Sequence, residues 1–227
     1  MGSLVSVIAV TGLAREARIA RRAKTIPVVS GGDGERLAVR LEEAITKHNP
    51  RGIVSFGIAG ALAPLLKVGD TIVASHVVHG DERYTTDPQW TAVLRQKLPF
   101  AKSAIIAGHG EIVSHIDGKR RLFALSGAHA VDMESHIAAR IANRHGIPFV
   151  AIRTISDAAT RGLPPAALVP LKPSGRIRLA GVLGAVAAEP GQISDLLTTG
   201  REAGRALRAL LRCRDALGPG LGCPYLG

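Results

Sequence analysis

Short apolar runs alternate along the chain with longer stretches in which apolar residues recur every three or four positions. The short runs predict strands, because they are rich in Val and Ile and are bounded by turn-forming residues. The longer stretches predict helices that cover those strands, a pattern typical of a mainly parallel sheet flanked by helices. The predicted strands are Leu4–Val10, Ile26–Val29, Gly52–Ser55, Thr71–Val78, Ala104–Ala107 and Phe149–Ile155.

Helix boundaries are indicated by capping residues and by proline. Asp132 is a plausible helix N-cap, and Gly and Pro residues stop the helices that they follow. The segment Thr160–Ser174 contains four prolines and is predicted to be a loop, and Leu217–Gly227 is predicted to be an irregular tail. The predicted helices are Gly34–His48, Met133–His145 and Gly191–Leu217.

The 227 residues, of which 46% are apolar, predict one α/β domain spanning residues 1–227. The net charge of +11 fits either a solvated Arg-rich surface or an anionic partner. We expect no nucleic-acid partner, because the sequence contains no helix-turn-helix pattern, zinc spacing or aromatic stacking platform. Two cysteines and no membrane-length apolar run favour a cytoplasmic protein, and the histidines show no metal-ligand spacing.

Small residues follow the third predicted strand. The run Ser55-Phe-Gly-Ile-Ala-Gly-Ala-Leu62 places Ala59 and Gly60 where the strand enters a turn. Glycine lets a ligand approach the backbone closely, so these two residues are candidate contacts for a substrate. The alternative is that the small residues only permit tight packing.

Two carboxylates occur in motifs beside predicted strands or helices. In Val131-Asp-Met-Glu-Ser135, Glu134 either favours the start of a helix through its charge or accepts hydrogen bonds from a sugar diol. In Arg153-Thr-Ile-Ser-Asp157, the aspartate follows a strand at the sheet edge where α/β proteins bind ligands. Asp157 either caps the next segment or donates a proton to a leaving group.

Two further turns carry weaker signals. Gly12-Leu-Ala-Arg-Glu16 follows the first strand, where Glu16 is either solvated or functional. The turn between the second strand and the next helix is Ser30-Gly-Gly-Asp-Gly34, which is a candidate site for binding an anion. Asp33 would repel an anion, so the alternative is a plain tight turn. Ser30, Gly31 and Arg153 are the candidate phosphate ligands.

In this order, the motifs resemble those of the nucleoside phosphorylase family, most closely its methylthioadenosine and S-adenosylhomocysteine nucleosidases. The similarity covers about residues 4–160 and is carried by GIAGALAPLLKVGD, VDMES and RTISD. The resemblance implies a central mixed, partly closed β-sheet with helices around it. It also implies cleavage of the N-glycosidic bond of a purine nucleoside without a cofactor, with inorganic phosphate as an alternative co-substrate to water.

Residue roles follow from the same resemblance. Asp157 matches the aspartate that protonates the purine N7, and Glu16 matches the glutamate that orients the attacking water. Glu134 matches the glutamate that binds the ribose hydroxyls, and Met133 the methionine that packs against the sugar. The remaining candidate substrate-binding residues are Asp132, Val113, Ile112, Ala59, Gly60 and Ser156.

The chain departs from the family pattern at several places. Ile58 replaces a hydroxyl that touches water or phosphate, which leaves the nucleophile open. Around Ile112 and Val113 the residues are aliphatic where relatives often offer an aromatic, although backbone groups of Val113 remain able to read adenine. Because of Ile58, a catalytically degenerate nucleoside-binding protein is a further alternative.

The last third resembles the hopanoid-associated branch of the family, which implies removal of adenine from adenosylhopane. The aliphatic segment 163–172 then covers an apolar 5′ channel, or it simply packs on the core. Arg residues recur on one face of the predicted C-terminal helix and Leu residues on another, which suggests peripheral contact with the inner membrane or a solvated helix. The resemblance also implies a homodimer. The residues concerned are Arg201, Arg205, Arg208, Arg212, Leu207, Leu210 and Leu211.

Overall fold

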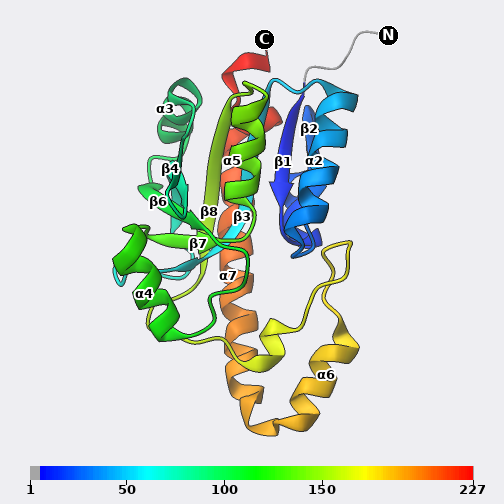
Figure 1. The fold of residues 1–227 in the computed structure, drawn as a ribbon, viewed down its shortest axis with the longest axis vertical. Coiled ribbons are helices and arrows are strands. Elements are labelled where there is room, and N and C mark those ends of the chain that lie inside the picture. Colours follow the sequence, from blue (N-terminus) through cyan, green and yellow to red (C-terminus); the bar gives the residue numbers. More distant parts are fainter. Residues whose placement is uncertain (1–5, 227) are drawn as a thin grey trace.

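The computed structural model describes residues 6–226, and Leu4 and Val5 of the first predicted strand lie outside them. The fold is a single α/β domain with a mixed sheet surrounded by helices, as predicted (Figure 1). The strands are β1 (Val7–Thr11), β2 (Thr25–Val29), β3 (Gly52–Ala61), β4 (Thr71–His79), β5 (Glu82–Thr85), β6 (Lys102–Gly108), β7 (Ala130–Asp132) and β8 (Phe149–Asp157). The α-helices are α1 (Ala14–Ala20), α2 (Gly34–His48), α3 (Pro88–Lys97), α4 (Ile116–Ser126), α5 (Ser135–Arg144), α6 (Leu179–Ala188) and α7 (Ile193–Leu217).

The sheet closes on itself over part of its width, which confirms the predicted partly closed architecture. Its strand order is β2-β1-β3-β7-β6-β4-β5, and β8 pairs with both β3 and β4. The strands β3, β8, β4, β6 and β7 therefore form a closed ring, from which β1 and β2 extend on one side. Because β1, β3 and β8 are mutually parallel, their carboxyl ends meet at one edge.

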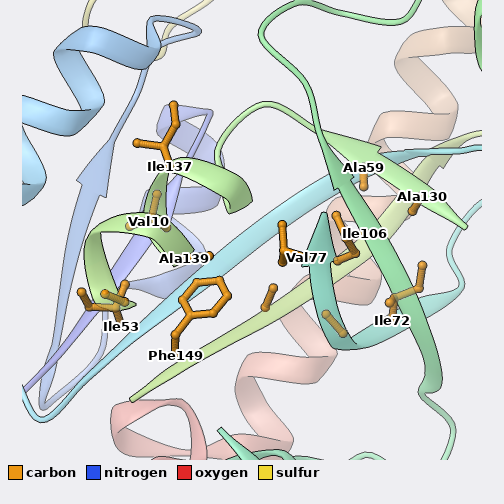
Figure 2. Close-up of a cluster of buried hydrophobic side chains, with 14 of the residues drawn as sticks. Val10, Ile53, Ala59, Ile72, Val77, Ile106, Ala130, Ile137, Ala139 and Phe149 are labelled. Atoms are coloured by element: carbon orange, nitrogen blue, oxygen red, sulfur yellow. The ribbon is translucent and has the colours of Figure 1, made fainter. Parts of the chain in front are cut away.

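Alternate residues of β1 enter two different cores, which explains why its sequence is continuously apolar. Ile8 and Val10 face α2 and α5, whereas Val7 and Ala9 face α3 and α7. Figure 2 shows the first core, where Ile137 of α5 lies beside β1 and the sheet residues around it are aliphatic apart from Phe149. Helices thus pack on both faces of the sheet and fix the edge at which the carboxyl ends of its parallel strands lie.

The ends of the predicted helices shift by small amounts. Helix α5 begins at Ser135, so Glu134 lies at its N-terminal boundary and not inside its first turn. The prediction of Asp132 as the N-cap is wrong, because the N-cap is Glu134. Asp132 still stabilises the start of the helix, since its Oδ1 accepts hydrogen bonds from the backbone N–H groups of Glu134 and Ser135. The predicted C-terminal helix begins at Ile193 instead of Gly191, because a short 3-10 turn precedes it.

The predicted irregular tail is more ordered than its sequence suggests. Residues 219–222 and 224–226 form 3-10 turns, and Leu221 and Leu226 are buried in the second core. Trp90 of α3 donates its indole N–H to the carbonyl of Leu221 at 3.1 Å. The tail therefore covers the end of the barrel-like sheet opposite α6.

Helix α6 was not predicted from the sequence, and it lies away from the sheet at the far end of α7 (Figure 1). None of its residues is buried, and Leu179 and Leu183 are 71% and 68% exposed. Between β8 and α6, residues 158–175 form a loop containing one 3-10 turn, in agreement with the predicted loop at Thr160–Ser174. Across the described part of the chain, no helix combines the length and apolar character needed to cross a membrane.

Candidate active site

A cavity of about 670 Å³ opens at the carboxyl ends of β1, β3 and β8. Its floor comes from these strand ends, and the loop 158–175, which we call the cover loop, forms one wall. Most of the site residues predicted from the sequence line it. These are Glu16, Gly31, Ala59, Gly60, Ile112, Val113, Asp132, Met133, Glu134, Ser156 and Asp157.

Glu134 is held on the cavity wall by two neighbours from distant parts of the chain. Ser30 donates a hydrogen bond to its Oε1 at 2.9 Å, and Nη2 of Arg153 lies 3.4 Å from its Oε2. A Cβ atom at Gly12 would lie 2.7 Å from Oε1, so only glycine leaves room for this carboxylate. Burial raises the pKa of Glu134 to about 7; Arg153 opposes the rise, and Asp132 and Glu16 add to it.

Glu16 is buried in the first turn of α1, and backbone groups satisfy both of its oxygens. Oε1 accepts a hydrogen bond from the N–H of Ile58, and Oε2 accepts from Gly12 and Leu13, each at 2.8 Å. Burial raises the pKa of Glu16, although Arg153 and the backbone donors act against the rise. Ile58 therefore supports the carboxylate through its backbone, although its side chain offers no hydroxyl.

Arg153 lies beneath these carboxylates and is fully buried. Its Nε is 2.8 Å from Oδ2 of Asp132, and its Nη2 donates to Oγ of Ser55 at 2.5 Å. Its positive charge compensates several buried carboxylates, which would otherwise be very costly to bury together. Gly57 is required opposite it, because a Cβ there would lie 2.4 Å from Nη1.

The three predicted phosphate ligands do not form an open anion site. Ser30 and Arg153 contact Glu134, and neither lines the cavity. Gly31 does line it, but its backbone N–H bonds to the carbonyl of Gly12 at 3.2 Å. Two of the three expected phosphate donors thus contact a carboxylate, and the charge of Arg153 is compensated inside the protein.

Asp157 ends β8, lines the cavity and is buried. Ser156 donates to its Oδ1 at 2.6 Å, and Nζ of Lys119 lies 2.5 Å from its Oδ2. Gly60 on the adjoining strand makes room for the carboxyl group, since a Cβ there would lie 3.1 Å from Oδ2. Sequence reasoning missed Lys119, because it lies in a run of three cations that reads as a solvated surface.

The remaining walls of the cavity are mostly apolar. Met133 is half-buried beside Glu134, and Ile112 and Val113 lie on the loop between β6 and α4. The cover loop contributes aliphatic residues from the segment 163–172, for which the sequence left open a channel cover or packing on the core. They are Leu163, Ala167, Leu168, Val169, Pro170 and Leu171.

The cover loop is tied to the body at both ends. The backbone N–H of Leu163 bonds to the carbonyl of Ser114 at 2.9 Å, and that of Ala14 bonds to the carbonyl of Gly175 at 3.0 Å. Arg40 also donates to the carbonyl of Pro173. The loop therefore crosses the mouth of the cavity between the start of α4 and the end of β1.

Comparison with known proteins places this geometry in a family. The sequence profile of the family described as "Phosphorylase superfamily" matches residues 21–170, more than half of the chain. Two relatives are named 5′-methylthioadenosine/S-adenosylhomocysteine nucleosidase. The one from Staphylococcus epidermidis is 28% identical over 51% of this chain, and the one from Baumannia cicadellinicola is 29% identical over 60%. The matched regions span 60% and 69% of those relatives, so the chain matches less than two thirds of the first.

Solved structures share the fold over nearly the whole chain. The S-adenosylhomocysteine nucleosidase of Streptococcus pyogenes, in complex with 5-methylthiotubericidin, has a TM-score of 0.65 at 19% identity and covers 93% of this chain and 96% of its own. The futalosine hydrolase of Helicobacter pylori has a TM-score of 0.65 at 17% identity, with coverages of 92% and 97%.

Proposed function

We propose, since this chain belongs to the Phosphorylase superfamily, that it cleaves the N-glycosidic bond of a purine nucleoside. The observation that carries the proposal is the convergence of Glu16, Glu134 and Asp157 on one cavity. The names of the relatives, which are nucleosidases acting on adenine-containing nucleosides, support the same activity.

The proposed reaction divides its chemistry among these three carboxyl groups. Glu134 accepts hydrogen bonds from the 2′ and 3′ hydroxyls and stabilises positive charge that develops on the ribose ring. As the C1′–N9 bond breaks, its electron pair goes to the base, and Asp157 gives a proton to N7. Glu16 takes a proton from the water whose oxygen bonds to C1′, so the products are free purine and free sugar.

We propose water as the nucleophile in place of phosphate. Among the described residues that line the cavity, five carry carboxyl groups and none is a lysine or arginine. Phosphate would be repelled by such a wall, since nearby like charges raise the free energy of a bound anion. The five residues are Glu16, Glu111, Asp132, Glu134 and Asp157.

The 5′ substituent of the substrate is proposed to be large and apolar. The cover loop supplies an aliphatic wall, and its 3-10 turn leads on towards α6, whose Leu179 and Leu183 are exposed. Adenosylhopane, in which a pentacyclic lipid replaces the 5′ hydroxyl, is the proposed substrate, with hopanoid biosynthesis as the setting. A methylthioadenosine-type nucleosidase is the second candidate, favoured by the names of the relatives.

We propose α6, and not the basic C-terminal helix, as the element that touches the inner membrane. Leu210 of α7 is fully buried and Leu207 packs against the second core, so of the three predicted leucines only Leu211 is exposed. Arg176 and Arg178 directly precede α6, and such cations favour an anionic bilayer. Wild-type protein should co-sediment with phosphatidylglycerol vesicles at low salt, and Leu183→Glu should not. Wild-type protein left in the supernatant contradicts the proposal.

A cytoplasmic homodimer is proposed as the working form. Both cysteines are buried and free, which suits a reducing compartment. Leu125 on α4 is 79% exposed and Ile112 beside the cavity is 45% exposed, and a second copy would cover such residues. Light scattering at micromolar concentration should give twice the chain mass of 23.7 kDa.

Adenine release tests the activity directly. Purified protein is incubated with adenosylhopane, methylthioadenosine and adenosine, each with and without phosphate, and adenine and sugar products are separated by chromatography. We expect adenine and free sugar from adenosylhopane, without ribosyl 1-phosphate. Asp157→Asn should bind the nucleoside but release little base. If neither the wild-type protein nor Asp157→Asn releases adenine from any substrate, the result would favour a nucleoside-binding protein instead.

A further inference from the structure

A lysine is buried directly behind the proposed proton donor. Lys119 on α4 has a side chain that is 1% exposed, and it does not line the cavity. Asp157, whose side chain is 8% exposed, lies between this ammonium group and the cavity. A charged group is costly to bury, so its presence here calls for a compensating role.

The ammonium group uses all of its donors on one short segment of chain. Nζ donates to Oδ2 of Asp157 at 2.5 Å, to the carbonyl of Ala158 at 2.8 Å and to the carbonyl of Arg161 at 2.9 Å. Because an ammonium has three N–H bonds, none is left over for a ligand. Lys119 therefore contacts the substrate only through Asp157.

These contacts distinguish the two carboxyl oxygens of Asp157. Oδ2 is fixed by Lys119, and Oδ1 accepts a hydrogen bond from Ser156, which itself lines the cavity. A partial rotation of the carboxyl group about the Cβ–Cγ bond would break both contacts. Oδ1 is consequently the oxygen available to carry the proton to the leaving base.

The same helix also fixes the wall near the base. Helix α4 follows directly after Ile112 and Val113, and Ser114 at its approach holds the cover loop through Leu163. Lys119, in the first turn of α4, attaches this same end of the helix to the end of β8 through Asp157 and to the start of the cover loop through Ala158 and Arg161. The start of α4 thus connects the cavity wall at Ile112 and Val113 with Asp157.

We propose that Lys119 is a positioning residue that holds Asp157 with Oδ1 directed at the leaving purine. The proposal rests on the proposed glycosidic cleavage. A positioning role predicts a selective defect, because only leaving groups that need a proton depend on the orientation of Asp157. A purine needs that proton, whereas a 4-nitrophenolate leaves readily as an anion.

The test compares the purine nucleoside with a 4-nitrophenyl ribofuranoside carrying the same 5′ group. Lys119→Met removes the ammonium and keeps the side-chain length. We expect kcat for purine release to fall about 10- to 100-fold, with KM for the purine nucleoside and the rate of nitrophenolate release within about threefold of wild type. Asp157→Asn shows how far the rate of purine release falls when residue 157 donates no proton.

Lys102→Met is the matched control, since Lys102 also pairs with an aspartate, Asp70, at 2.6 Å but is half exposed and outside the cavity. It should leave both rates unchanged. If Lys119→Met does not fold, as judged by its thermal unfolding, Lys119→Gln is used, because it keeps an N–H donor in a similar volume. Relative to wild type, the rate of purine release by Lys119→Gln should again fall more than its rate of nitrophenolate release.

Two results overturn the proposal while leaving the glycosidic activity intact. Equal losses on the two substrates would show that Lys119 supports the whole site without orienting the acid. A purine rate like that of wild type would show that Asp157 needs no such support. A wild-type protein inactive on every nucleoside would instead refute the proposed function, and the positioning role with it.

Discussion

The hydroxyl of Ser30 donates a hydrogen bond of 2.9 Å to Oε1 of Glu134, from a residue 104 positions away in the sequence. Ser30 follows β2, whereas Glu134 stands just before α5, so the contact exists only once the sheet has formed. Oγ of Ser30 in turn accepts the backbone N–H of Gly32 at 3.1 Å. The turn after β2 therefore orients the proposed ribose-binding carboxylate.

Ser30→Ala should weaken nucleoside binding. A hydrogen bond to a charged acceptor contributes about 1.5–3 kcal/mol, so we expect KM to rise about tenfold with little change in kcat. Because the Ser30 hydrogen bond lowers the pKa of Glu134, its loss should also move the acid limb of the kcat/KM profile to higher pH. Ser103→Ala, on the exposed end of β6, is the control. An unchanged KM would mean that Glu134 is held without Ser30.

The pH dependence of substrate binding should report the ionisation of Glu134. Only the carboxylate accepts both ribose hydroxyls, and its pKa is raised to about 7, chiefly by burial. We therefore expect kcat/KM of the wild-type protein to rise with pH through about 7. Glu134→Gln should have a much lower kcat/KM that does not rise in this pH range. Initial rates from pH 5 to 9 measure it. A profile with the same limb in the glutamine variant would assign the titration to another group.

Stability should depend on pH through the same residue. Between pH 4.5, the ordinary pKa of a glutamate, and about pH 7, the folded protein holds a proton on Glu134, whereas the unfolded chain has released it. The free energy of unfolding should therefore fall as pH rises through this window, by at most about 1.4 kcal/mol per pH unit. His136 acts in the opposite sense from about pH 4 to 6.5, because burial lowers its pKa to about 4.

Urea unfolding of wild type and Glu134→Gln at pH 5 and pH 7.5 separates the two contributions. His136 is present in both proteins, so its effect cancels in the difference between them. The glutamine variant should gain stability relative to wild type as pH rises. A constant difference between the two proteins would contradict the raised pKa of Glu134.

Most of the architecture was accessible from the sequence, because buried strands are continuously apolar and their ends carry Gly, Asp or Ser. Asp157 was identifiable as a candidate because it ends a predicted strand, and Glu134 because it stands at the start of a predicted helix in the motif VDMES. Helix α6 was missed because ten consecutive apolar or glycine residues show no polar face. Strand β7 is only three residues long, which is too short for an alternating pattern.

The partners of the site residues were beyond sequence reasoning. Lys119 stands in an apparently solvated basic run, and only the fold shows that its ammonium reaches Asp157, 38 positions later. Arg153 was a reasonable phosphate ligand because it is the first residue of the motif RTISD. Its burial against Asp132, Ser55 and Glu134 depends on three separate segments meeting below the cavity floor.

Gly57→Ala should damage the site through crowding. The added Cβ would lie 2.4 Å from Nη1 of Arg153 and 2.7 Å from Oε1 of Glu16, and both groups are fixed by buried contacts. We expect a loss of about 1–3 kcal/mol in stability together with a reduced kcat, measured by urea unfolding and adenine release. Gly200→Ala on α7 meets open space and should stabilise by about 0.5–1 kcal/mol. Full activity in Gly57→Ala would show that Arg153 and Glu16 can shift without lowering the rate of adenine release.

Glu16→Gln should separate water activation from substrate binding. Glutamine cannot take a proton from water, and its amide nitrogen would face a backbone N–H at Ile58 or at Gly12, so kcat should fall about 10²–10⁴-fold. Nucleoside binding, measured by calorimetry, should change little, because Glu134 and Asp157 remain. Glu43→Gln, exposed on α2, is the control. Added formate should restore part of the rate in Glu16→Ala by replacing the missing carboxylate. A kcat within about threefold of wild type in both variants would remove Glu16 from the mechanism and require another base for the water.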